Sequence, residues 1–228
     1  MSTDPKEHRR VNDILLGPLE RPALQWLAAR QPAWMTPDKL TAIGTFGGLV
    51  IFVSYWLSNF NPAWLWVANL GLVINWYGDS LDGTLARYRN IQRPKYGFFI
   101  DHTIDGLNEM LVILGMGVSP YVSFNVAAMA LIGYLLMSVY VYVRTFVTGV
   151  FKISYGKLGP TEGRVIIGLL NVGMFFLGPR AVQTPWGPVL PLDIAVAALA
   201  ALLLAMYLGN TLRTARELSG IDRPPAAQ

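Results

Sequence analysis

Four aspartates lie at the facing ends of two apolar segments, in the stretch from Asp79 to Asp105. Asp79 and Asp82 are three positions apart, and Asp101 and Asp105 are four positions apart. Residues with these spacings share one face of a helix, so each pair should project from neighbouring turns. Only a short loop around Pro94 separates the two segments, which makes the helices antiparallel neighbours. The spacing therefore predicts that the four carboxylates converge.

A metal site is the chemistry that such a group of carboxylates favours. Converging carboxylates near a bilayer repel one another, and each is costly to remove from water, so a positive charge is expected among them. The chain has no cysteine. Oxygen ligands without sulfur or nitrogen partners favour a hard divalent cation, Mg²⁺ first and Mn²⁺ or Ca²⁺ next. Two ions could be accommodated, which would suit a displacement reaction at phosphorus.

Three further residues share the helical face of the first aspartate pair: Gly83, Ala86 and Arg87. The two small residues leave a gap in which a flat or bulky group can approach the backbone. Arg87 lies beyond them and supplies a fixed cation that is suited to phosphate. Metal, gap and arginine together indicate a site for a pyrophosphate nucleotide that is bound through a metal ion.

The elements that carry these residues are predicted to span a membrane. Of the 228 residues, 53% are apolar and only 14% are charged, which argues against a water-soluble globular chain. A spanning helix needs about 20 mostly apolar residues. Six segments meet this requirement approximately, and the fifth of them is short: Leu40–Leu57, Ala63–Leu85, Tyr96–Val118, Phe124–Val147, Arg164–Leu177 and Val189–Leu208.

An interfacial segment is predicted to precede the six spans. Between Arg10 and Arg30, apolar positions are interspersed with charges and two prolines, which is typical of one or two short amphipathic helices on a membrane surface. The chain thus divides into an N-terminal interfacial segment (1–36), a six-helix membrane domain (37–212) and a cytoplasmic tail (213–228). The predicted fold class is an all-α integral membrane protein.

The charge distribution predicts how the spans are oriented. In the six-span arrangement every lysine and arginine except Arg180 falls on one side of the membrane. Basic residues mark the cytoplasmic side of membrane proteins. Both termini and the aspartates are therefore expected to face the cytoplasm, at the inner membrane if the chain is bacterial.

The residues around the aspartates resemble a known family signature. The pattern Asp-x-x-Asp-Gly-x-x-Ala-Arg, then nine residues, then Gly-x-x-x-Asp-x-x-x-Asp, is similar to that of the CDP-alcohol phosphotransferases. Every fixed position is matched, by Asp79, Asp82, Gly83, Ala86, Arg87, Gly97, Asp101 and Asp105. That family has six spans preceded by an interfacial helix and usually forms homodimers, and the resemblance implies the same here.

The resemblance also implies a reaction in which an alcohol attacks the phosphorus of a CDP-linked donor and CMP leaves. The ligands that it implies for two Mg²⁺ ions, or for Mn²⁺, are Asp79, Asp82, Asp101 and Asp105. The residues that it implies for the cytidine nucleotide are Asp79, Gly83, Ala86 and Arg87. Asp105 would in addition be the general base that takes the proton of the attacking hydroxyl. The two roles of Asp105 compete, and both stay open.

Three polar residues outside the signature are predicted to contact the acceptor: Asn108, Arg144 and Arg164. Asn108 continues the helical face of the second aspartate pair. In family members with a phosphorylated acceptor, basic residues near the loop between spans four and five bind its phosphate. Asn75 and Glu109 each have two interpretations, a functional contact or a hydrogen bond to a neighbouring helix.

Two branches of the family would fit the sequence. In the first, CDP-diacylglycerol donates a phosphatidyl group to a small polar or phosphorylated alcohol. In the second, CDP-choline or CDP-ethanolamine donates its headgroup to diacylglycerol. The short chain and the basic residues near the loop favour the first branch, which is preferred. The pairing of Asp101 with His102 and the segment Gly159–Gly163 resemble the second.

A divalent-cation transporter is the rival from a different class of protein. It would place acidic residues near the bilayer midplane, often with an internal repeat. Here the aspartates lie at helix ends, and Gly83, Ala86 and Arg87 have no evident purpose in an ion path. Nucleic-acid binding is not expected, because the positive charge is spread along a membrane face without a separate soluble module.

Overall fold

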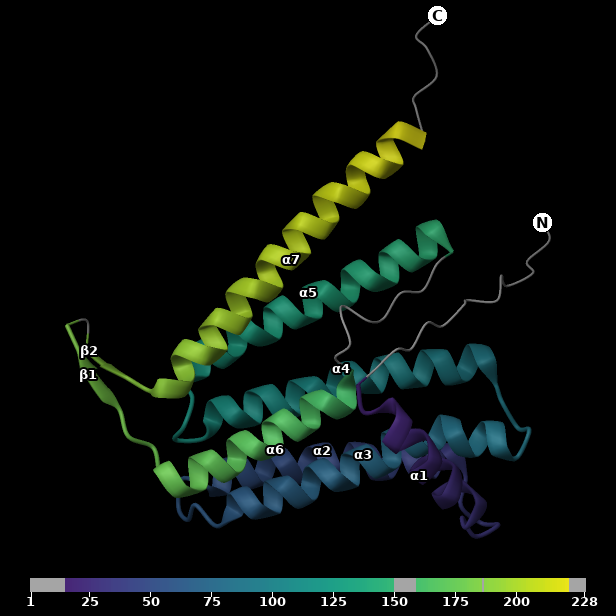
Figure 1. The fold of residues 1–228 in the computed structure, drawn as a ribbon, viewed down its shortest axis with the longest axis horizontal. Helices are drawn as coiled ribbons and strands as arrows, with labels where there is room; N and C mark the ends of the chain where they lie inside the picture. The colour runs from purple at the N-terminus through teal and green to yellow at the C-terminus, as the bar shows by residue number, and fades with distance from the viewer. Residues whose placement is uncertain (1–14, 150–158, 186, 222–228) are drawn as a thin grey trace, which may run out of the picture.

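Seven helices and one small β-hairpin make up the described part of the protein. The computed structural model describes residues 15–149, 159–185 and 187–221. Figure 1 shows α1 and the connection between α3 and α4 at one end of the molecule and the hairpin at the other. The elements are α1 (Gly17–Ala29), α2 (Pro37–Leu57), α3 (Trp64–Tyr88), α4 (Pro94–Val118), α5 (Phe124–Thr148), α6 (Pro160–Leu177), β1 (Val182–Thr184), β2 (Gly187–Val189) and α7 (Pro191–Ile221).

Proline and glycine positions mark where several helices begin and end. Proline is the first residue of α2, α4, α6 and α7, a position where its missing N–H costs no hydrogen bond. Thr36 caps α2, because its hydroxyl accepts a hydrogen bond of 3.3 Å from the backbone N–H of Lys39. α5 ends at Thr148 and is followed by Gly149, whose φ of 71° is a left-handed conformation that favours glycine.

α2 and α3 cross at a contact made by glycines. A Cβ atom at Gly78 would lie 2.2 Å from the backbone nitrogen of Gly44, and one at Gly47 would lie 2.5 Å from that of Asn75. Neither position has room for a side chain, so the two helix backbones touch. Small residues allow membrane helices to pack in this way. The crossing brings the first turns of α2 against the half of α3 that carries the first aspartate pair.

α1 is packed into one end of the bundle. Glu20 accepts two hydrogen bonds of 2.7 Å, one from the indole N–H of Trp76 on α3 and one from the hydroxyl of Thr161 on α6. The predicted interfacial segment therefore contains one helix that joins α3 to α6, and residues 1–14 lie outside the described part. The buried apolar residues at this end are Leu24, Ala28, Met35, Leu40, Leu81 and Leu85.

α7 packs against α5, away from α2 and α3 (Figure 1). Near the start of both helices, Asp193 accepts hydrogen bonds of 2.7 and 2.6 Å from the backbone and the hydroxyl of Ser123. Near their ends, the hydroxyls of Tyr140 and Thr214 lie 2.8 Å apart. Much of α7 is exposed, including the side chain of Leu202. An apolar surface of this kind fits a lipid environment.

Three of the described helices are long and apolar enough to cross a bilayer, namely α2, α5 and α7. α3 and α4 are 25 residues long and carry the aspartates. α6 is 18 residues long and carries Glu162 and Arg164 in its first turns. The all-α fold is thus confirmed, and six membrane spans stay a prediction.

The predicted spans differ from the helices mainly at the fifth and sixth. The fifth, expected from Arg164, begins at Pro160, because the Glu162 carboxylate accepts a hydrogen bond of 2.8 Å from the N–H of Gly159 and closes the first turn. The sixth does not begin at Val189, which pairs with Val182 in the hairpin. It continues to Ile221, so residues 213–221 of the predicted tail are helical.

Candidate active site

Three of the four signature aspartates meet at one end of the bundle. One carboxylate oxygen from each of Asp79, Asp101 and Asp105 lies within 4.8 Å of the others, and all three residues are partly buried. We call these three residues the aspartate cluster. α3 contributes the first of them and α4 the other two, while both helices pack against α2. The structure thus brings Asp79 of the first pair to both members of the second, whereas the spacing predicted that all four would converge.

Asp82 lies beside the aspartate cluster and is bonded to α2. Its carboxylate accepts a hydrogen bond of 2.6 Å from the hydroxyl of Thr41 and another from the backbone N–H of Gly83. The charges of Asp79 and Asp101 act on it, so it borders the cluster. Sequence reasoning did not find Thr41, because a threonine inside an apolar segment gives no sign of which residue it will meet.

Arg164 closes the aspartate cluster from α6. Its guanidinium forms an ion pair with Asp79 through Nη2, and its Nε donates a hydrogen bond of 2.8 Å to the side-chain oxygen of Asn75. The amide of Asn75 in turn donates a hydrogen bond of 2.9 Å to the carbonyl of Gly44 on α2. The sequence allowed Asn75 either a functional contact or a hydrogen bond to a neighbouring helix, and the structure shows the hydrogen bond between helices. Three helices are therefore joined at Arg164 and Asn75.

Two polar residues of α4 lie deeper in the bundle. Glu109 lies close enough to Tyr134 of α5 for the two side chains to interact, which favours a contact with a neighbouring helix. Asn108 is buried against α2, where a Cβ atom at Gly48 would lie 2.7 Å from its side-chain oxygen. That oxygen has no hydrogen-bond partner in the described part of the chain. The acceptor contact of Asn108 stays a prediction.

The residues predicted to hold the nucleotide lie on the last turns of α3. Arg87 is exposed, and its side chain bends back toward Gly83. A Cβ atom at Gly83 would lie 3.3 Å from Nη1 of Arg87. The guanidinium also donates a hydrogen bond of 3.2 Å to Thr84. Ala86 is partly buried. Gly97 of α4 borders open space, because a Cβ atom there would have no described atom within 4 Å. Small residues and a cation thus lie together on these turns, and nucleotide binding by them stays a prediction.

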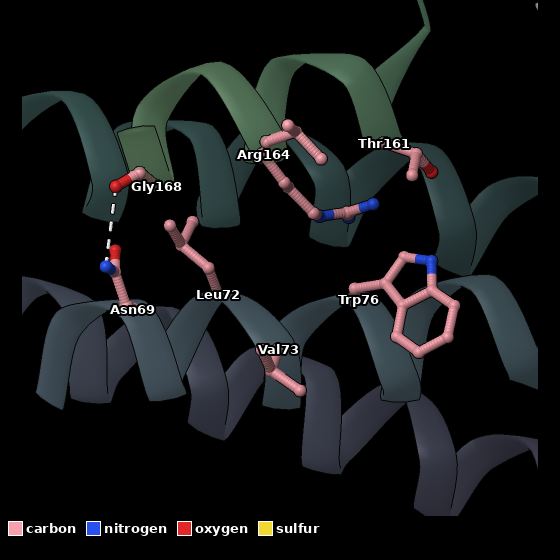
Figure 2. A pocket seen from close by; sticks show the side chains of 8 residues that line it. Asn69, Leu72, Val73, Trp76, Thr161, Arg164 and Gly168 are labelled. Carbon is pink, nitrogen blue, oxygen red and sulfur yellow. Dashed lines mark hydrogen bonds between the residues drawn. The ribbon is translucent and has the colours of Figure 1, made fainter. Parts of the chain in front are cut away.

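An apolar pocket of about 340 Å³ separates α3 from α6 next to Arg164. Figure 2 shows Leu72 and Val73 on the α3 side and Arg164 entering from α6. Asn69 bridges the two helices at one end, where its amide donates a hydrogen bond of 3.4 Å to the carbonyl of Gly168. The pocket is mainly apolar, and Asn69, Thr161 and the guanidinium of Arg164 supply its polar groups.

Arg144 of α5 is not joined to the aspartate cluster by any ion pair among the described residues. Its Nε is enclosed and lacks a hydrogen-bond partner in the same part of the structure. Tyr142, two positions before it, lies near enough for the charges of Asp105 and Asp101 to act on it. The acceptor contact of Arg144 stays a prediction.

The segment Gly159–Gly163 has a structural role in this protein. Glu162 accepts hydrogen bonds of 2.7 and 2.8 Å from the backbone N–H groups of Leu16 and Gly159, and Thr161 bonds to Glu20 of α1. Its polar side chains therefore fasten α1 to the start of α6. The available signal was the glutamate at the third helical position, which is part of a capping pattern.

Comparison with known proteins places the chain in a family. The family model of CDP-alcohol phosphatidyltransferases matches residues 34–214. The chain belongs to the CDP-alcohol phosphatidyltransferase family. This family is embedded in membranes and acts on CDP-linked donors, so together with three long apolar helices it marks the chain as an integral membrane protein.

Several curated relatives carry a functional name. Cholinephosphotransferase 1 of Gallus gallus is 28% identical over 180 residues, which is 72% of this chain and 50% of that protein. Archaetidylinositol phosphate synthase of Pyrococcus horikoshii is 32% identical over 104 residues, 46% of this chain and 52% of that protein. Phosphatidylinositol phosphate synthase of Cutibacterium acnes is 32% identical over 84 residues, 37% and 38% of the two chains. The chain thus spans about half the length of the first of these relatives.

The donor atoms of the aspartate cluster fit a divalent cation. Three carboxylates supply hard oxygen ligands within 4.8 Å of one another, and Mg²⁺ and Mn²⁺ prefer such ligands. Asp82 offers a further carboxylate at the edge of the cluster. The chain can therefore provide a cation site from its own residues, in a family that uses divalent cations.

Proposed function

We propose that this protein transfers a phosphatidyl group from CDP-diacylglycerol to a small polar or phosphorylated alcohol, with release of CMP. The observation that carries the proposal is the aspartate cluster in a chain that matches the CDP-alcohol phosphatidyltransferase family. Clustered carboxylates repel one another, and a bound cation would offset this repulsion together with Arg164. The signature residues around the cluster supply the surface for a CDP group.

In this proposal the aspartate cluster and Asp82 bind Mg²⁺ or Mn²⁺, with room for two ions. Bound ions of this kind polarise phosphoryl oxygens and offset the charge that develops on the leaving group. The exposed guanidinium of Arg87 holds a phosphate of the CDP group beside Gly83 and Ala86. Asp105 is proposed as a ligand or as the base that takes the proton of the attacking hydroxyl.

The pocket between α3 and α6 supports a substrate with a hydrocarbon part. Its walls are mainly apolar, and the guanidinium of Arg164 borders it. A lipid chain gains free energy by leaving water for such a surface, and a nearby cation favours its phosphate. Asn108 and Arg144 are proposed to contact the acceptor with Arg164.

A second branch is supported by a specific observation. The cholinephosphotransferase of Gallus gallus aligns with 72% of this chain, more than the archaetidylinositol phosphate synthase and the phosphatidylinositol phosphate synthase do. Transfer of a CDP-choline or CDP-ethanolamine headgroup to diacylglycerol is therefore the alternative. Both branches use the same cation site and release the same nucleotide, so they differ only in what the donor and acceptor carry.

The membrane arrangement is part of the proposal. We infer that α2 to α7 all cross the bilayer, that α1 lies at its cytoplasmic surface, and that the aspartate cluster faces the cytoplasm. The basic residues support this orientation, because all but Arg180 belong to one side of the six-span arrangement. The homodimer that the resemblance implies stays a prediction.

The first experiment is a CMP-release assay on purified protein in lipid with Mg²⁺. One series contains CDP-diacylglycerol with inositol phosphate, glycerol phosphate or serine as acceptor. The other contains CDP-choline or CDP-ethanolamine with diacylglycerol. CMP release in the first series that depends on one acceptor is the expected result. Release only in the second series would move the protein to the alternative branch, and no release in either would contradict the proposal.

Asp101→Asn is expected to lower the rate of CMP release by a factor of about a thousand or more, because an amide cannot replace a carboxylate as ligand of a hard cation. EDTA should have the same effect on the unchanged protein, and excess Mg²⁺ should reverse it. Asp38→Asn is the matched control, since Asp38 is exposed and paired with Arg93 at the same end of the bundle. Equal loss in both variants would argue against the metal assignment.

A further inference from the structure

Arg164 pairs with a carboxylate that a bound cation would also use. The guanidinium pairs with Asp79, and the side chains of both residues are largely shielded from solvent, being 16% and 20% exposed. Asp79 is at the same time one of the three residues whose oxygens form the aspartate cluster. A single carboxylate therefore belongs both to the ion pair with Arg164 and to the potential cation site.

The guanidinium is held in place by more than the ion pair. Its Nε donates a hydrogen bond of 2.8 Å to Asn75, which is itself anchored to the backbone of α2. Its Nη1 is enclosed and has no hydrogen-bond partner in the described part of the structure. The charge of Arg164 also acts on Asp105 and on Glu109. Arg164 is thus the cation that compensates this group of acidic residues from the α6 side.

A second positive charge in the aspartate cluster must compete with the first. Two cations that share one carboxylate repel each other, and repulsion is strong where solvent screens little. Coupling between two binding events is reciprocal. Arg164 therefore weakens cation binding by the same free energy by which a bound cation weakens the ion pair of Arg164 with Asp79.

We propose that Arg164 is a displaceable counter-ion of Asp79, so that a divalent cation binds the aspartate cluster in competition with this guanidinium. The inference rests on the metal site of the proposed function. It assigns Arg164 a role in setting cation affinity, in addition to the predicted contact with the acceptor. A displaced guanidinium would remain beside the pocket, where it could pair with a substrate phosphate.

Direct measurement of cation binding tests this without any turnover. Mn²⁺ is titrated into the full chain in lipid nanodiscs, without nucleotide, and free Mn²⁺ is followed by electron paramagnetic resonance. The variants are Arg164→Gln, which removes the charge, and Arg164→Lys, whose single nitrogen cannot reach Asn75 and Asp79 in the same way. Arg93→Gln is the matched control, because it removes an equal charge from an exposed pair at the same end of the bundle.

Arg164→Gln is expected to lower the Kd of Mn²⁺ by about tenfold, the size of coupling that two ligands of one site commonly show. Arg164→Lys should lower it less, by about threefold, because the charge remains but the double contact is lost. Arg93→Gln should leave it within about twofold, since exposed pairs are weak and screened.

Other outcomes separate this inference from the proposed function. An unchanged or higher Kd in Arg164→Gln, with Mn²⁺ binding abolished in Asp101→Asn, would overturn the competition and leave the metal site intact. If Arg164→Gln does not fold, the same result in Arg164→Lys decides against the competition. No Mn²⁺ binding by the unchanged protein would remove the metal site and this inference together.

Discussion

At the scale of single residues, the aspartates of the signature have different surroundings although they belong to one pattern. Asp79 pairs with Arg164, whereas Asp82 is bonded to Thr41 on α2. A carboxylate that accepts a hydroxyl hydrogen bond keeps one fixed orientation and one fewer free lone pair. Thr41 therefore orients Asp82 relative to the aspartate cluster.

Thr41→Val tests this orientation with a side chain of nearly the same shape. The variant removes the hydrogen bond of 2.6 Å to Asp82 and should lower kcat/KM for CMP release by about tenfold, the cost of losing a hydrogen bond to a charged group. The measurement is the CMP-release assay with the preferred donor and acceptor.

Thr45→Val is the control for the change of threonine to valine in α2. Thr45 lies one turn further along the helix and donates a hydrogen bond of 2.9 Å to the backbone carbonyl of Thr41, not to an aspartate. Near-normal kcat/KM is expected for this variant. If the two variants lose activity equally, Thr41 acts through helix packing and not through Asp82.

At the scale of elements, the glycine contact between α2 and α3 determines where the site residues meet. The helix backbones touch at Gly44 and Gly78, one turn from Thr41 and Asp82 respectively. Any increase in the separation of the two helices would lengthen the bond between those side chains. Site geometry and helix packing are therefore linked at this crossing.

Gly78→Ala is expected to destabilise the protein by about 3 kcal/mol, because the added methyl group would lie 2.2 Å from backbone atoms that cannot move independently. The melting temperature in detergent should fall by several degrees, and CMP release should fall with it. Thermal unfolding followed by fluorescence and size-exclusion chromatography measures the change.

The matched substitution is Gly173→Ala in α6. A Cβ atom at this position would have no described atom within 4 Å, and alanine favours a helix over glycine by up to about 1 kcal/mol. The melting temperature should stay the same or rise slightly. If the melting temperature of Gly173→Ala fell as much as that of Gly78→Ala, the close contact at the glycine crossing would not be the cause of the destabilisation.

At the scale of the whole molecule, the orientation in the membrane decides which substrates can reach the site. Figure 1 shows the connection between α2 and α3 and the connection between α3 and α4 at opposite ends of the bundle. Phe60 lies in the first connection and Ile91 in the second, and both side chains are exposed. The proposed orientation places Ile91 on the cytoplasmic side.

Single cysteines test this orientation directly, because the chain has no cysteine of its own. In sealed cells, a membrane-impermeant maleimide should label Phe60→Cys and should label Ile91→Cys only after the membrane is opened. Labelling is measured by the mass shift of the purified protein. The reverse pattern would place the aspartate cluster outside the cytoplasm, and labelling of both in sealed cells would argue against a span over α3.

Much of the architecture and the location of the site could be predicted from the sequence. The apolar segments predicted the long helices to within a few residues for four of the six spans. The fifth differs because the Glu162 side chain caps the N–H of Gly159, so that α6 begins before the predicted span. The sixth differs because polar residues continue α7 beyond its apolar part. The small hairpin was not predicted, since its three-residue strands are too short to show a pattern.

The sequence by itself determined which acidic residues could share a helix face, and the tertiary structure alone decided what each of them contacts. Spacing of aspartates along a helix is a local property, so the helical period alone places Asp101 and Asp105 on one face of α4. Asp79 meets them because α3 and α4 both pack against α2. The contacts of Thr41 with Asp82 and of Arg164 with Asp79 join residues far apart in the chain. They depend on where helix backbones cross, which is set by packing between helices and not by the period of any one of them.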